Sequence, residues 1–421
     1  MRTSRWLCPG GLLLQTDKKL KHLSFFEVLS KAGNDCPDYR AVSAGLVTLR
    51  LVDAWLHGVV ALESREFSTR QVRSSIDAVD DGTVVRPILN RLLDAASGRA
   101  PDVRSVITPL MAYGQALEFD ARWELAADVY HTLLAHLHPI ENSEACIAAH
   151  LRLGSCHRNL NRVEDASIAY AAAGEIGASV GDMVGVLRAR IGEAYIATFK
   201  GNLPKAQRLL DDTIEHAVGH DLADVRSRAL HDRSGVAILS GQYELAIRFA
   251  YDALELSTVA SERDKILNNI AGAFALLGVY SAARDAYLVL STTAQDQYTR
   301  WAASLNLLDV SSMTGMRTVF EEYRRQLLDL TLPPQLATAF ELTQGQGFYR
   351  FGEPAKARFH LERAIELAAA QEFNQYLIEA EQALAAITEP PQVKREATSL
   401  PLDLQEVAGA IRSLRATVGA T

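Results

Sequence analysis

Cationic side chains recur along the chain at nearly equal distances. Arg188, Arg228 and Lys265 are separated by 40 and 37 residues. An arginine can hold a carboxylate through two parallel hydrogen bonds, and a lysine can donate to the same group as a compact charge. If a periodic fold brings these positions together, they form a row that can bind an acidic group.

Polar side chains occupy a second register next to this cationic row. Asparagine both donates and accepts hydrogen bonds, so it can pair with an extended backbone. The predicted guest is therefore an extended protein or peptide segment, in particular an acidic one or a C-terminus. The alternative is that these are solvated residues of a first helical turn, paired with acids of the next repeat. The candidate binding residues in the two registers are Arg152, Arg188, Arg228, His231, Lys265, Asn268, Asn269 and Asn306, with Asp232 beside them.

Histidine and cysteine side chains cluster in one part of the chain, at His131, His136, His138, Cys146, His150 and His157. Imidazole and thiolate are zinc ligands. However, histidines near helix C-termini are favoured by the helix dipole, and small buried cysteines are common packing residues. We therefore predict no metal site. A Walker loop, a nucleophile elbow and an HExxH helix are also absent from the sequence, so we predict no catalytic residue and no cofactor.

Composition and charge exclude several classes of protein. The chain of 421 residues is 48% apolar and 22% charged, which is typical of a globular protein. Residues 1–100 hold 14 basic against 11 acidic side chains, whereas residues 101–388 hold 25 against 36. Because nucleic-acid binding draws mainly on phosphate neutralisation, the acidic body argues against a nucleic acid as partner.

Cysteine content and hydropathy predict the compartment. Four cysteines are too few for a disulfide framework, which favours a reducing environment. The apolar stretch near the N-terminus is interrupted by Pro9, Gly10 and Gly11, unlike the core of a signal peptide. No segment approaches the roughly 18 apolar residues that a membrane span needs. We expect a cytoplasmic protein without a membrane segment.

The spacing of small residues shows how the chain positions the cationic row. Anchor residues follow one another at intervals of 40 and then 37, at Ala126, Ala166, Ala206, Ala246, Ala283, Phe320 and Ala357. Five residues before each anchor stands a residue suited to a left-handed turn. These seven residues, five of which are glycine, are Ala121, Asn161, Gly201, Gly241, Gly278, Gly315 and Gly352. Twelve residues before the anchor, six of seven side chains are small. Between turns, apolar residues step by three and four, so each unit is predicted to be two antiparallel helices.

These offsets resemble the tetratricopeptide repeat, in which a small residue, a turn glycine, an aromatic residue, an alanine and a second aromatic residue follow in order. Ala271, Gly278, Tyr280, Ala283 and Tyr287 show the pattern. The period exceeds the usual 34 residues, and the sixth unit around Phe320 matches poorly. The long period is similar to that of relatives in bacterial regulators and scaffolds. The resemblance implies an all-α fold, a right-handed α-solenoid of about seven hairpins whose concave groove holds partners.

The repeats divide the chain into three predicted parts. Residues 101–388 form the solenoid, with a capping helix over 374–387 that Pro390 and Pro391 end. Residues 1–100 form an N-terminal cap or a separate small helical domain, with helices over 41–56, 69–79 and 84–96. Residues 389–421 form a linker and an amphipathic helix from about Asp403 to Arg415. The apolar stripe of that helix, at Leu404, Val407, Ile411 and Leu414, either folds back on the array or docks on another subunit of a homo-oligomer.

The function that these expectations favour is a non-catalytic scaffold or adaptor for protein–protein interaction, which binds a peptide or protein segment in the concave groove. Two alternatives remain open at this point. One is a peptide sensor whose curvature changes on binding, and the other is a structural subunit that assembles through its C-terminal helix.

Overall fold

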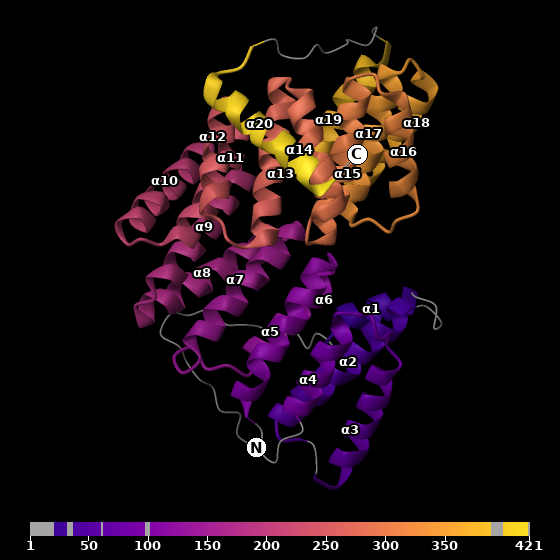
Figure 1. Ribbon diagram of the computed structural model, residues 1–421. Coiled ribbons are helices and arrows are strands. Elements are labelled where there is room, and N and C mark those ends of the chain that lie inside the picture. Colours follow the sequence, from indigo (N-terminus) through magenta and orange to yellow (C-terminus); the bar gives the residue numbers. More distant parts are fainter. Residues whose placement is uncertain (1–20, 32–36, 60–61, 97–101, 389–398, 420–421) are drawn as a thin grey trace. The chain divides into compact units, whose positions relative to one another are not determined.

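A computed structural model describes residues 21–31, 37–59, 62–96, 102–388 and 399–419 (Figure 1). Within these ranges the chain is all-α, with twenty α-helices, one short 3-10 helix (Ala386–Thr388) and no strand, which confirms the predicted fold class. The chain divides into two compact units, Met1–Pro109 and Leu110–Thr421. The boundary between the two units lies inside the helix Val103–Phe119.

The first unit is built around one long helix. Its helices are α1 (Leu23–Lys31), α2 (Pro37–Leu56), α3 (Leu62–Asp77), α4 (Val85–Ala95) and the start of α5 (Val103–Phe119). Helix α2 packs against α1, α3 and α4. Fully buried side chains from all four helices fill the core, among them Phe25, Leu49, Ile76 and Leu89.

The second unit consists of consecutive helical hairpins in which first and second helices alternate as the sequence predicts. The first helices after α5 are α7 (Ser143–Asn159), α9 (Met183–Phe199), α11 (Ala223–Leu239), α13 (Ala260–Leu277), α15 (Gln297–Met313) and α17 (Pro334–Arg350). The second helices are α6 (Trp123–Leu134), α8 (Val163–Val180), α10 (Leu203–Gly219), α12 (Tyr243–Leu256), α14 (Tyr280–Thr293), α16 (Arg317–Leu328) and α18 (Pro354–Ala370). Each helix packs mainly on its neighbours in the chain, as in a solenoid.

The predicted turn residues reverse the chain in every hairpin. All seven of them, from Ala121 to Gly352, adopt a positive φ between 56° and 85°. In one example, the Val279 backbone N–H donates to the Phe274 carbonyl oxygen at 2.8 Å across the left-handed Gly278. This arrangement satisfies a carbonyl that the end of the helix would leave unpaired, and it turns the chain directly into the next helix.

Small residues twelve positions before the anchor let the two helices of a hairpin approach closely. A Cβ added to Gly154 would lie 2.6 Å from the ring of Tyr170, and one added to Gly114 would lie 2.5 Å from the ring of Tyr130. The sixth unit departs from the pattern because its anchor is Phe320. There the following unit provides the space, since a Cβ on Gly347 would lie 2.3 Å from the Phe320 ring.

Two helices complete the second unit. Helix α19 (Asn374–Ala385) covers α17 and α18, as expected for a cap. Helix α20 (Leu402–Val418) lies across α12 and α14 (Figure 1), so its stripe folds back on the array. Leu404, Val407 and Ile411 are buried there, whereas Leu414, at the end of the stripe, is 41% exposed. The predicted linker with its two prolines lies outside the described residues.

Ion pairs fix both ends of α20 to the array. Arg248 of α12 pairs with Asp403 at 2.7 Å, and Arg415 pairs with Asp285 of α14 at 2.7 Å. Cys146 and Cys156 are buried free thiols, whereas Cys8, Cys36 and the N-terminal apolar stretch lie outside the described residues. None of the described helices combines the length and apolar character that a membrane crossing requires.

Candidate functional site

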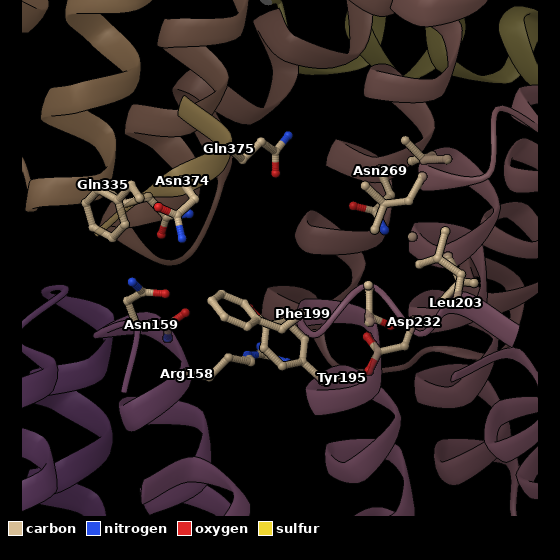
Figure 2. A pocket seen from close by; sticks show the side chains of 18 of the residues that line it. Arg158, Asn159, Tyr195, Phe199, Leu203, Asp232, Asn269, Gln335, Asn374 and Gln375 are labelled. Atoms are coloured by element: carbon tan, nitrogen blue, oxygen red, sulfur yellow. The ribbon is translucent and has the colours of Figure 1, made fainter. Parts of the chain in front are cut away.

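A cleft of about 840 Å³ lies on the inner side of the second unit (Figure 2). Its walls come from the last turns of α7 and α9, the middle of α11 and the start of α10. The opposite side comes from α13, α15, α17 and the corner between α18 and α19. The residues that line the cleft include Arg158, Asn159, Tyr195, Phe199, Asp232, Gly235, Leu239, Asn269, Tyr298, Gln335, Glu372, Asn374, Gln375 and Tyr376.

The cleft has walls on opposite sides because the curved array brings distant hairpins together. The side-chain nitrogen of Asn161, the turn residue of one hairpin, donates to the Gln371 carbonyl oxygen at 3.4 Å. The ring of Trp123 at the start of α6 meets Tyr298 of α15 edge-on, with ring centroids 5.1 Å apart. The inner wall is thus partly covered by the chain's own C-terminal hairpins, and a bounded chamber remains.

A cation, an aromatic ring and a carboxylate follow one another along the floor of the cleft (Figure 2). The Arg158 guanidinium lies over the Tyr195 ring, 4.4 Å from its centroid, and Asp232 lies on the far side of that ring. Burial lowers the pKa of Arg158, but the nearby phenols and Asp232 raise it by more, so the net shift is upward and the side chain stays charged. Cation–π contact holds the guanidinium in place.

Amide and phenol groups line the rest of the cleft. Burial raises the pKa of Tyr195, Tyr298 and Tyr376, so each phenol remains protonated and can donate. The Tyr298 hydroxyl donates to Gln335 at 3.5 Å. Asn269 donates through its side-chain nitrogen to the Ser234 hydroxyl at 3.1 Å. Further amides come from Asn159, Asn374 and Gln375. Such a surface can exchange hydrogen bonds with a peptide backbone.

Two of the eight residues predicted to bind a partner, His231 and Asn269, line this cleft. Burial lowers the pKa of His231, which favours the neutral imidazole. The Asn306 side-chain nitrogen donates to the Asn268 side-chain oxygen at 3.4 Å, so these two amides pair with each other between α15 and α13. Neither of them lines the cleft.

The predicted cationic row is paired with acids of the chain itself. Arg188 lies 2.6 Å from Asp224, and Arg228 lies 3.3 Å from the same carboxylate. Lys265 lies 3.5 Å from Glu262, which Arg228 also approaches at 3.6 Å. Arg152 lies 3.4 Å from Glu118. Some of these contacts are ion pairs with acids of the next repeat, which was the alternative interpretation of the row in the sequence.

Glu262 is the centre of this ion-pair network. Burial raises its pKa, but Lys265, Arg228 and other nearby cations lower it by more, to about 2. The carboxylate is therefore ionised across the physiological range, and it neutralises charge that the row would otherwise present to a guest.

The histidine cluster lies at the junction of α6 and α7. The rings of His131 and His157 have centroids 5.8 Å apart. Burial lowers the pKa of His157 to about 4 and also lowers that of His150. Burial raises the pKa of the Cys146 thiol, so this site favours the uncharged forms of its side chains.

Sequence reasoning missed Arg158, Tyr195 and the residues of the α18–α19 corner. Arg158 and Tyr195 occupy different offsets from their anchors, eight and eleven residues before them, so no single register contains both. The corner comes from hairpins far along the chain, and only the curvature of the array brings it to the cleft. A usable signal was the pair of aromatic residues Tyr195 and Phe199 on one face of α9.

No known family's sequence model matches the chain, and no curated protein matches it in sequence. Solved structures resemble its fold at low identity. A Rap protein complexed with competence and sporulation factor is 12% identical over 84% of this chain and 98% of its own, with a TM-score of 0.46. The Rap conjugation regulator of plasmid pLS20, solved with the Phr* peptide, is 13% identical over 83% and 98%, with a TM-score of 0.49.

A tetratricopeptide repeat protein from Parabacteroides merdae is 15% identical over 65% of this chain and 98% of its own, with a TM-score of 0.40. These likenesses concern the fold. The left-handed turns and the glycine–ring contacts of the hairpins define the second unit itself as an α-solenoid of stacked helical hairpins.

Proposed function

We propose that the chain is a non-catalytic binding protein whose second unit captures a short, extended peptide segment in the cleft. The observation that carries this proposal is a cleft of about 840 Å³ whose lining combines amides, phenols and one stacked guanidinium with apolar side chains such as Phe199 and Leu239. Its volume falls in the range of about 300–1,000 Å³ that is typical of ligand sites.

The chemistry of the lining supports a peptide over other guests. Peptide backbones offer N–H and C=O groups in alternation, and the amides of Asn159, Asn269, Asn374 and Gln375 can pair with both. Phe199 and Leu239 are 51% and 53% exposed at the ends of α9 and α11, where they can cover an apolar side chain of the guest.

A peptide sensor is the second candidate, and the closing contacts of the array favour it. Two contacts join the early hairpins to the late ones, Asn161 with Gln371 and Trp123 with Tyr298. A guest that fills the cleft lies against both sets of hairpins. Binding would therefore favour one curvature of the solenoid. Small-angle scattering with and without a bound peptide separates a sensor, which changes shape, from a static adaptor.

The experiment that tests the proposal uses the full chain and an arrayed library of free hexapeptides. Gly235 faces the cleft, and the nearest side-chain atom to a Cβ added there is the Asn269 nitrogen at 4.0 Å. A Cβ at this position therefore meets no clash, and the ring of a Gly235→Phe variant takes up space in the cleft. Gly409→Phe is the matched control, because Gly409 lies on the exposed face of α20 with no atom within 4 Å of an added Cβ.

We expect the wild-type chain and Gly409→Phe to retain the same hexapeptides and Gly235→Phe to lose them. Unchanged retention by a folded Gly235→Phe variant would exclude the cleft. The predicted row is tested in the same assay by replacing Arg188 and Arg228 with glutamate. If the row binds the guest directly, this double variant loses the retained peptides as well.

A further inference from the structure

The charges inside the cleft differ from those of the predicted row. The lining contains one cation, Arg158, and two carboxylates, Asp232 and Glu372. The cations of the row face Asp224, Glu262 and Glu118 instead. A guest in the cleft therefore meets a surface of mixed charge, which does not favour a purely acidic segment.

Arg158 is held ready for an anion that the chain does not supply. Among the described residues, no carboxylate lies within the 4.0 Å ion-pair distance of its guanidinium, in contrast to Arg152, Arg188 and Arg228. The Tyr195 ring covers one face of the guanidinium. An immobilised guanidinium loses little further freedom when it binds a carboxylate through its edge, so this geometry suits a bidentate contact.

Asp232 is the counterpart of opposite sign. No cation lies within ion-pair distance of its carboxylate in the described part of the chain, although Arg158 is close enough for its pKa to respond to Asp232. The two residues come from α7 and α11, and Tyr195 of α9 stands between them (Figure 2). The fold thus presents two opposite charges on either side of the Tyr195 ring, close enough to interact but not paired in a direct salt bridge.

Resting on the proposed function, we infer that the cleft selects a dipolar peptide, with a carboxylate bound by Arg158 and a basic side chain bound by Asp232. Each contact places a group of the guest against an opposite charge in a partly desolvated site, where a hydrogen-bonded pair is stronger than in water. A guest with one charge only leaves Arg158 or Asp232 desolvated without compensation.

The hexapeptide library tests this inference when it contains all combinations of acidic, basic and neutral residues, each with a free and an amidated C-terminus. We expect the wild-type chain to retain peptides that carry both charges. Comparison of free with amidated peptides shows whether the carboxylate is the C-terminus or an acidic side chain. Arg158→Gln should weaken binding of these peptides about tenfold or more, as expected for loss of a charged hydrogen-bonded partner.

Two further variants separate charge recognition from a general effect on folding. Asp232→Asn should remove the preference for a basic residue and keep the preference for a carboxylate. Arg158→Lys keeps the charge but loses the planar fork, so it should bind between wild type and Arg158→Gln. Thermal unfolding checks that each variant is folded.

Each outcome decides between the two proposals. Retention of peptides regardless of charge, with loss in Gly235→Phe, contradicts the dipolar inference and leaves peptide capture intact. Equal binding by wild type, Arg158→Gln and Asp232→Asn also contradicts the dipolar inference without contradicting peptide capture. Retention of no hexapeptide by the wild-type chain contradicts peptide capture itself.

Discussion

The indole ring of Trp123 lies edge-on against the phenol ring of Tyr298, with centroids 5.1 Å apart, although four hairpins separate the two helices that carry them. Both rings are largely removed from solvent. Because edge-to-face aromatic pairs add to the free energy gained by burial, this contact stabilises the curvature that encloses the cleft.

Removing the indole should open this closure. We expect Trp123→Ala to lower the free energy of unfolding by about 3–5 kcal/mol, as for other buried aromatic truncations, and to weaken hexapeptide retention. Tyr298→Phe keeps the ring contact and should cost much less. Urea unfolding of both variants measures the difference, and a stability for Trp123→Ala equal to that of wild type would contradict the role of the contact.

Glycine is required where a ring occupies the space of a Cβ. Gly154→Ala would place its Cβ 2.6 Å from the Tyr170 ring, so we expect a loss of about 1–3 kcal/mol from overpacking. Gly409→Ala introduces the same methyl group into open space in α20 and should stabilise the chain slightly. The account of hairpin packing fails if thermal unfolding shows the same change for both.

Two apolar residues of α20, one buried and one exposed, show which face of the helix packs on the array. Ile411 is 4% exposed against α12 and α14, whereas Leu414 is 41% exposed. We expect Ile411→Ala to cost about 2–4 kcal/mol and Leu414→Ala to cost less than about 0.5 kcal/mol. Equal costs in chemical denaturation would mean that α20 is not docked as described.

His157 should make stability depend on pH. Its pKa in the folded chain is about 4, below the ordinary value of 6.5, mainly because of burial. The unfolded chain therefore binds the proton more readily, so this contribution is complete above about pH 6.5 and is lost as the pH falls towards 4. The loss amounts to about 3 kcal/mol.

His157→Gln should flatten the fall in unfolding free energy between about pH 6.5 and 4. Glu262 also contributes to stability, but that contribution is lost only as the pH falls from about 4.5 to 2, because the pKa of Glu262 is lowered from 4.5 to about 2. An unchanged pH profile for the variant in urea unfolding experiments would show that His157 is not the group responsible.

Local pattern was sufficient to predict the hairpins. Gly201 and Gly278 each follow a helical apolar pattern and adopt a left-handed conformation, so their role can be read from the local sequence. Phe320 could not be understood from its own unit, because the compensating space comes from Gly347 in the next first helix. Leu414 fits a helical stripe by spacing, but the contact face of α20 is narrower than the stripe.

The cleft depends on geometry that accumulates along the array. A small rotation from each hairpin to the next decides whether Gln371 reaches Asn161, and no short segment encodes that sum. The predicted row shows the converse. The sequence identified Arg188 and Arg228 as recurring cations, but only the structure reveals that Asp224 lies between them.

Amide hydrogen exchange in the presence of the most strongly retained hexapeptide shows directly where the peptide binds. If the peptide lies in the cleft, exchange slows in the last turns of α7 and α9, the middle of α11 and the start of α19, and it does not change on the convex faces of α12 and α14. Protection confined to the convex face or to the first unit, with exchange around Arg158 and Asp232 unaltered, would contradict binding in the cleft.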